Sequence, residues 1–146
     1  KMVNITLHVG MGTFLPLKYN TVKQNFLHSE TGIISKQSAR VLNNSIKQGK
    51  KIVAVGTTVL RLLEACYIKN QQIQYFNEET DLFIYPGFKF NVVDKLLTNF
   101  HLPKSSLLLL VSAFAGKKEV FDIYEYAKIK KLRFFSFGDA MLINKK

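Results

Sequence analysis

The alternation of short apolar runs with segments of helical periodicity is the feature that most restricts the fold of this chain. Runs rich in β-branched residues predict strands, and apolar residues three or four positions apart predict helices. Strands are expected at Val3–Val9, Ile52–Val55, Leu82–Tyr85, Leu96–Phe100 and Arg133–Ser136. Helices are expected from Ser35 or Lys36 to Gly49, from the Gly56-Thr57-Thr58 turn to about Ile68, from Pro103 to about Ala115, and over Val120–Lys131, with Lys69–Thr80 as a loop. This order predicts an α/β protein with a mainly parallel sheet and flanking helices.

The stretch between residues 86 and 116 concentrates polar side chains ahead of an expected helix. Asp94, Thr98, Asn99 and His101 fall within eight residues of one another, around an expected strand. Ligands of open α/β sheets bind beyond the carboxyl ends of the strands. The pattern therefore predicts a site in this stretch.

Charge and hydropathy narrow the classes of function. The chain has 146 residues, of which 47% are hydrophobic, so one globular domain with a buried core is expected. The formal net charge of +11 fits a polyanionic partner such as RNA, although most of the 21 basic residues are lysines spread along the chain, and a lysine bias of the source would give the same count. No targeting segment is visible, and the apolar run Leu107–Ala115 is shorter than the ~20 residues of a membrane span. A soluble, cytoplasmic protein is expected.

Motifs of several common enzyme classes are incomplete or missing. The segment Gly10–Leu15 has two glycines of a dinucleotide fingerprint, but Leu15 stands where the third glycine belongs, and no GxxxxGK[ST] loop is present. The single cysteine, Cys66, excludes an internal disulfide, and its apolar helical surroundings favour packing over nucleophilic catalysis. No metal is expected, because metal-ligand spacing is absent among the three histidines, His8, His28 and His101.

The turn Val55-Gly56-Thr57-Thr58 joins an expected strand to a helix and carries two hydroxyl groups. Backbone N–H groups and the positive end of the helix dipole make such a turn a ready anion site. Threonine is also a good N-cap, so Thr57 can equally serve to cap the helix. Both interpretations stay open at this point.

Several separated motifs together resemble one family. These are LHVGMGTFLPL at residues 7–17, the His-Ser-Glu motif at 28–30, VGTTVLRLLE at 55–64, the stretch 86–116 with TNFHLP, and RFFSFGDAMLI at 133–143. In this order they resemble the C-terminal part of the S-adenosylmethionine:tRNA ribosyltransferase-isomerases of queuosine biosynthesis. The resemblance covers nearly the whole chain.

The resemblance implies a larger protein. Residues 1–146 would be the C-terminal part of a barrel-like catalytic α/β domain, whose N-terminal part and small inserted β-barrel domain are absent from this sequence. The first expected strand has no element before it to pack with, which agrees with that implication. A separate N-terminal half is then one expected partner, and the protein is otherwise expected to be a monomer.

The reaction that the resemblance implies uses S-adenosylmethionine as a ribosyl donor. The ribosyl unit is transferred to 7-aminomethyl-7-deazaguanine at the wobble position of tRNA and isomerised to give epoxyqueuosine, while adenine and methionine leave. Such a reaction needs a base for the ribose carbon next to the sulfonium, an acid for adenine departure, and exclusion of water. No metal is implied.

Candidate site residues follow from the matched motifs. Those expected to be catalytic are His101, Asp94 and Asp139, with His101 suited to proton shuttling by its usual pKa of about 6.5. Those expected to bind S-adenosylmethionine or tRNA are His8, Gly10, Gly12, Thr13, Gly56, Thr57, Thr58, Arg61, Thr98 and Asn99. Structural roles remain open for several: Asp94 as a turn cap, Asn99 as a loop brace, and His101 as a packing partner of a phenylalanine.

Four positions depart from the family pattern by losing a hydroxyl. Val59 stands where the family usually has serine, and tyrosine is usual where this chain has Phe88, Leu132 and Phe137. These losses and the missing N-terminal half favour an alternative, in which the chain is an inert remnant that at most binds RNA or a nucleotide. The retained TNFHLP and GDAMLI segments favour the enzyme. Without the resemblance, a cytosolic nucleotide-binding protein is the expected class.

Overall fold

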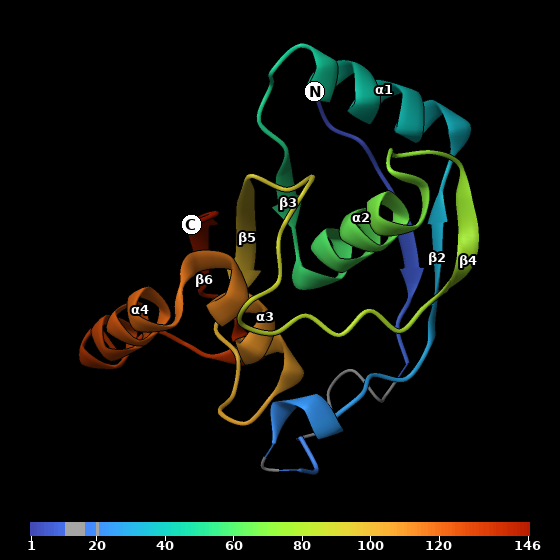
Figure 1. Ribbon diagram of the computed structural model, residues 1–146. Helices are drawn as coiled ribbons and strands as arrows, with labels where there is room; N and C mark the ends of the chain where they lie inside the picture. Colours follow the sequence, from blue (N-terminus) through green and yellow to red (C-terminus); the bar gives the residue numbers. More distant parts are fainter. Residues whose placement is uncertain (11–16, 20) are drawn as a thin grey trace.

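Two three-stranded sheets enclose a central helix in the computed structural model, which describes residues 1–10, 17–19 and 21–146 (Figure 1). The first sheet has the order β1-β2-β4 and is antiparallel, with β1 at Thr6–His8, β2 at Glu30–Ile34 and β4 at Phe76–Thr80. The second has the order β3-β5-β6, with β3 at Val53–Val55, β5 at Lys95–Asn99 and β6 at Ala140–Asn144. The helices are α1 (Lys36–Lys47), α2 (Thr57–Asn70), α3 (Ser106–Ala115) and α4 (Lys117–Ile129), with short 3-10 turns η2 (Val22–Gln24) and η3 (Phe135–Phe137).

The expected α/β class is confirmed, but the expected mainly parallel sheet is wrong. Among the described strands only β3 and β5 pair in parallel, and the other pairings are antiparallel. The two sheets are separate and do not close into a barrel. The difference arises because three strands with antiparallel partners, β2, β4 and β6, were not predicted. β4 has the sequence FNEET, which is polar and mostly exposed at a sheet edge and therefore lacks a strand-like apolar pattern.

Three of the predicted strands differ from the structure. Residues 82–85 and 133–136 are not in strands, and only residues 6–8 of the stretch 3–9 are, with two of those three residues exposed. Ile84 is nevertheless buried, because the segment between β4 and β5 packs against the core through its side chains rather than through a strand ladder. The prediction of a strand over Leu82–Tyr85 is therefore wrong, although Ile84 packs in the core and the other three residues are partly buried.

The helices agree more closely with the sequence prediction. α1 begins after Ser35, whose hydroxyl accepts the Ser38 N–H, and a positive φ of 67° at Gly49 follows its end. α3 begins at Ser106 rather than Pro103, because Ser105 supplies its N-cap. No helix among the described residues is long and apolar enough to cross a membrane.

α2 is the core element of the fold. It packs against strands of both sheets and against α3 (Figure 1). Its buried residues lie on most sides of the helix. Cys66 on this helix is fully buried, which confirms its predicted packing role, and burial raises the pKa of its thiol. Because α2 is held on several sides, its N-terminus has a fixed position beside the ends of β3 and β5.

Candidate functional site

A cleft of about 600 Å³ lies where β3 and β5 end and where α2 and α3 begin. β3 and β5 are parallel neighbours, so their carboxyl ends meet at the same edge of the sheet. The apolar wall of the cleft includes Leu102, Pro103 and Leu107. Six of the predicted site residues line this cleft together: Gly56, Thr57, Thr58, Thr98, Asn99 and His101.

The N-terminus of α2 forms one side of the cleft. Gly56 has a φ of 97°, which a residue with a side chain rarely adopts, and its N–H donates to the Leu97 carbonyl oxygen at 2.8 Å. Gly56 is the N-cap residue, so the interpretation of Thr57 as the cap is wrong, and no side chain caps this helix. Serine hydroxyls do cap α1 and α3. The N–H groups and positive dipole end of α2 therefore face a cleft that can hold an anion.

His101 and Thr98 are paired inside the cleft. Thr98 Oγ1 lies 3.1 Å from His101 Nε2, so one hydrogen bond joins the hydroxyl and the ring. The His101 backbone N–H donates to the Tyr124 hydroxyl at 2.8 Å, which fixes the residue from the other side. Only 8% of His101 is exposed, and this burial lowers its pKa to about 4. The imidazole is therefore neutral at pH 7. From the sequence, the usual histidine pKa of about 6.5 was expected instead.

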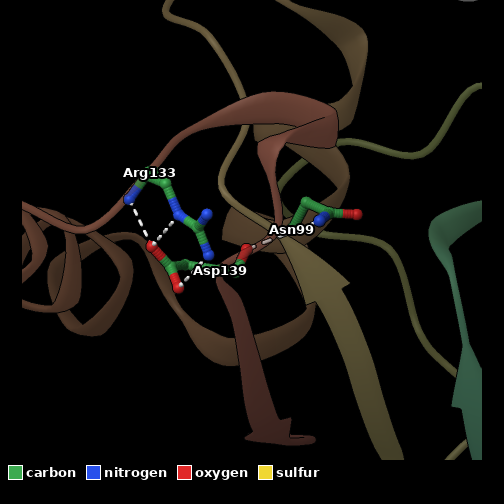
Figure 2. A network of polar contacts seen from close by, with 3 residues as sticks. All are labelled: Asn99, Arg133 and Asp139. Atoms are coloured by element: carbon green, nitrogen blue, oxygen red, sulfur yellow. Dashed lines mark hydrogen bonds and ion pairs between the residues drawn. The ribbon is translucent and has the colours of Figure 1, made fainter.

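Asn99 lies beside an ion pair in the C-terminal segment (Figure 2). Its Nδ2 donates to the Asp139 backbone oxygen at 3.4 Å. The Asp139 carboxylate accepts from the Arg133 N–H at 2.5 Å and from Arg133 Nε at 3.2 Å. The side-chain hydrogen bond with Arg133 is the main reason why the pKa of Asp139 is lowered. Asp139 is thus ionised and paired near the cleft but does not line it, and its catalytic role stays a prediction.

Two residues that line the cleft have left-handed backbones that the sequence does not predict. Lys104 has a φ of 57°, and Phe135 has a φ of 62°. The Phe135 N–H donates to the Phe100 carbonyl oxygen at 2.9 Å, which ties the η3 turn to the end of β5. Non-glycine residues with positive φ are uncommon and often mark functional sites. No local sequence signal predicts this backbone for a lysine or a phenylalanine.

Asp94 lies at the opposite end of β5 from the cleft. It accepts the Ile52 N–H at 2.9 Å and pairs with Lys51 Nζ at 3.2 Å. Desolvation acts in the opposite direction, but these bonds and the nearby lysines lower the pKa of Asp94 overall. Since Asp94 precedes the strand while Thr98 and Asn99 end it, the three were not brought together, and a catalytic role of Asp94 is left as a prediction.

The remaining predicted residues lie outside the cleft or outside the described part of the chain. Arg61 is buried on α2 and forms an ion pair with Glu30 at the start of β2. Burial is the largest influence on Arg61 and lowers its pKa, against the effect of Glu30. His8 and Gly10 are exposed at the end of β1 and just beyond it. Gly12 and Thr13 lie outside the described residues.

Glu64 is a buried acid whose role the sequence did not reveal. Its carboxylate is fully buried and accepts the backbone N–H groups of residues 91, 92 and 93 at 2.8, 2.9 and 3.1 Å. These bonds fasten the segment before β5 to α2. Glu64 therefore sets the relative position of the two elements that form the cleft. Among the described residues no three His, Cys, Asp or Glu side chains lie together as a metal site requires.

The fold and the cleft define an α/β protein with a candidate small-molecule or anion site at the carboxyl ends of two parallel strands. The sequence model of the queuosine biosynthesis protein family matches residues 1–143, and the chain belongs to this family. It is 51% identical over 145 residues to an S-adenosylmethionine:tRNA ribosyltransferase-isomerase of a Psychrobacter species, covering 97% of this chain and 37% of that protein. The corresponding protein of Finegoldia magna is 52% identical, covering 98% of this chain and 42% of the relative.

A solved structure supports the same relationship. The crystal structure of the S-adenosylmethionine tRNA ribosyltransferase from Thermotoga maritima matches with a TM-score of 0.73 and 52% identity. The match covers 78% of this chain and 40% of that protein. The chain therefore spans about two fifths of the length of the relatives it matches.

Proposed function

We propose that this chain is part of an S-adenosylmethionine:tRNA ribosyltransferase-isomerase and contributes one wall of its active site. The enzyme would transfer the ribosyl unit of S-adenosylmethionine to 7-aminomethyl-7-deazaguanine in cytoplasmic tRNA, giving epoxyqueuosine, adenine and methionine. The observation that carries this proposal is the cleft, which gathers six residues of two separate family-like motifs. The names and identities of the relatives support the same activity.

The cleft has suitable dimensions and groups for the ribosyl donor. Its volume of about 600 Å³ is within the ~300–1,000 Å³ typical of small-molecule sites. The uncapped N-terminus of α2, with Gly56, Thr57 and Thr58, would hold the methionine carboxylate or a tRNA phosphate. Thr98 and Asn99 would bind ribose hydroxyl groups or a base edge.

His101 would act as the base. The ring of His101 is neutral near pH 7 and can accept a proton, but its pKa of about 4 makes it a weaker base than an ordinary histidine, so the acidity of the substrate proton would have to supply the driving force. The proton removed would be the one on the ribose carbon next to the sulfonium, whose positive charge acidifies it. Thr98 would orient the ring through its hydrogen bond to Nε2. The ionised carboxylate of Asp139, which lies near the cleft, remains a candidate for offsetting the sulfonium charge, whereas Asp94 lies at the other end of β5.

The second sheet supports the proposal that the rest of the catalytic domain packs against this chain. One face of the β3-β5-β6 sheet is apolar and open: Val53 is 50% exposed, Val55 65%, Leu97 37% and Leu142 60%. Val55 pairs with Leu97, and Leu97 pairs with Leu142, so these three form one row across the sheet. An apolar surface of this kind is typical of an interface. We infer that residues 1–146 form the C-terminal part of that domain and that this face contacts the remainder.

The experiment combines this chain with the N-terminal part of a relative and measures adenine released from S-adenosylmethionine with the modified tRNA. The reconstituted protein is expected to release adenine, and His101→Gln is expected to lower kcat by about 100-fold or more while S-adenosylmethionine still binds. No release by a well-folded pair would contradict the proposal and favour the inert remnant. Unchanged turnover of His101→Gln would contradict the role of His101 alone.

A further inference from the structure

The outer face of α1 carries positive charge without any acidic residue. Lys36, Arg40 and Lys47 are exposed on this helix, and Lys50 follows it. No Asp or Glu occurs anywhere between residues 31 and 63, although the whole chain has 10 acidic residues. Residues 1–29 and 95–118 also lack acidic residues, so α1 is set apart by the placement of its cations and not by the missing acids alone.

The three cations on α1 share one side of the helix. Positions 36, 40 and 47 are separated by four and seven residues, which returns to the same face at about 3.6 residues per turn, and they span about 17 Å along the axis. The opposite side of α1 is fixed to the protein. Ala39 and Leu42 are buried there. α1 lies at the top of Figure 1, away from α3 and α4, so its outer side faces solvent.

These cations are also unpaired. Lys36, Arg40 and Lys47 form no ion pair with any described residue. Lys51, which follows α1 in the sequence, does form one, with Asp94. On α4 the pattern is different, because Lys118 pairs with Asp122 and Lys128 with Glu125, both at 2.6 Å. α1 therefore presents three cations without an ion pair on one helix, although Lys117, Lys130 and Lys131 on and after α4 also form none of the ion pairs among the described residues.

Helix stability does not explain this arrangement. Lys36 is in the first turn of α1, where the positive end of the helix dipole disfavours a cation, and no acid occupies that turn. Lys36 and Arg40 are also four residues apart, where like charges repel. Lys36 and Arg40 therefore weaken the helix in isolation, whereas Lys47 lies in the last turn, where the dipole favours a cation. An anion bound beside Lys36 and Arg40 would relieve the unfavourable charge distribution at the first two turns.

We propose that the outer face of α1 binds the phosphate backbone of the RNA substrate, at a second contact distinct from the cleft. This inference rests on the proposed function, which supplies an RNA partner. The exposed neutral residues between the cations include Gln37 and Asn44, whose amides can bond to phosphate or ribose oxygens. Only Ile46 adds exposed apolar surface to α1, at 40%, which is too little for a helix that inserts into a membrane surface.

The test compares two triple variants that remove the same charge. The first is Lys36→Gln, Arg40→Gln and Lys47→Gln, on the unpaired face of α1. The matched control neutralises three lysines that are already in ion pairs, as Lys118→Gln, Lys128→Gln and Lys146→Gln. Affinity for tRNA is measured from 50 to 200 mM KCl with the reconstituted protein, after circular dichroism has verified the fold of each variant.

The α1 variant is expected to bind tRNA about tenfold or more weakly at low salt and to lose about 2 from the slope of log Kd against log salt, because each phosphate contact contributes ~0.7–0.9. The control is expected to change much less. Equal losses in the two variants would overturn the proposal, since net charge alone would then explain binding. So would an α1 variant that keeps its tRNA affinity but loses binding to anionic phospholipid vesicles.

The readouts separate this proposal from the proposed function. Binding of S-adenosylmethionine should be the same in the wild type and the α1 variant, because α1 does not line the cleft. A protein that releases no adenine but shows the α1-dependent salt slope would refute the enzymatic proposal alone. A protein that releases adenine with an unchanged KM for tRNA in the α1 variant would refute the α1 proposal alone.

Discussion

Acidification is expected to destabilise the protein through His101. The side chain is 8% exposed and has a pKa of about 4 in the folded protein, where burial is the cause of the decrease. In the unfolded chain the pKa returns to about 6.5. The unfolded state therefore takes up a proton first as the pH falls. Stability that is fully present above pH 6.5 is lost between about pH 6.5 and 4, and no further loss from this residue is expected below that range.

The size of this effect follows from the two pKa values. The difference between a pKa of 6.5 in the unfolded chain and about 4 in the folded protein lowers the free energy of unfolding by about 3 kcal/mol once His101 is charged in both states. At pH 5 the unfolded chain is almost fully protonated and the folded protein is not. The expected loss between pH 7.5 and 5 is therefore about 2 kcal/mol from this residue.

Urea unfolding at pH 7.5 and pH 5 measures this loss, with variants to separate His101 from the carboxylates. His101→Gln is expected to lose about 2 kcal/mol less than the wild type between the two pH values. His28→Gln is the matched control, because His28 is exposed, and it should behave as the wild type. The same pH dependence in wild type and His101→Gln would refute the reasoning that burial keeps His101 neutral.

Three further predictions concern groups that hold α2 and α3 in place. Glu64→Gln is expected to cost about 1.5–3 kcal/mol in urea unfolding, because a buried charged acceptor for the N–H groups of residues 91–93 is lost; an unchanged midpoint would contradict this. Arg61→Met is expected to cost about 3 kcal/mol or more, and adding Glu30→Gln should recover part of it in a double-mutant cycle, whereas additive losses would contradict a coupled pair. Ser105→Ala, which removes the α3 cap, should cost about 1 kcal/mol by the same assay, and a cost below 0.3 would exclude a capping role.

The cleft was largely predictable because its residues lie on local strand–turn–helix units. The turn at Gly56-Thr57-Thr58 and the polar residues after β5 each carry a local pattern, and the parallel pairing of β3 and β5 then brings their ends together. Asp94 was grouped with these residues from the sequence. It comes before β5, whereas Thr98 and Asn99 are at the end of the strand, so Asp94 lies at the opposite edge of the sheet.

What the sequence did not reveal depends on contacts between distant residues. β2 and β4 pair with each other across more than 40 residues, and neither has an apolar strand pattern of sufficient length. Glu64 was read only as part of a helix, because its partners are backbone N–H groups 27 to 29 residues away. The pKa of His101 was unpredictable for a similar reason, since it depends on burial, which only the assembled fold determines.

The most direct test of the central claim is whether the cleft binds S-adenosylmethionine. Calorimetric titration of the reconstituted protein compares the wild type with Ser136→Trp, which adds an indole to a residue that lines the cleft. Lys118→Trp on the exposed side of α4 is the control for the added ring. Saturable binding is expected for the wild type and the control, and Ser136→Trp is expected to lose binding at an unchanged unfolding temperature. Equal affinities in all three proteins would contradict the placement of the site.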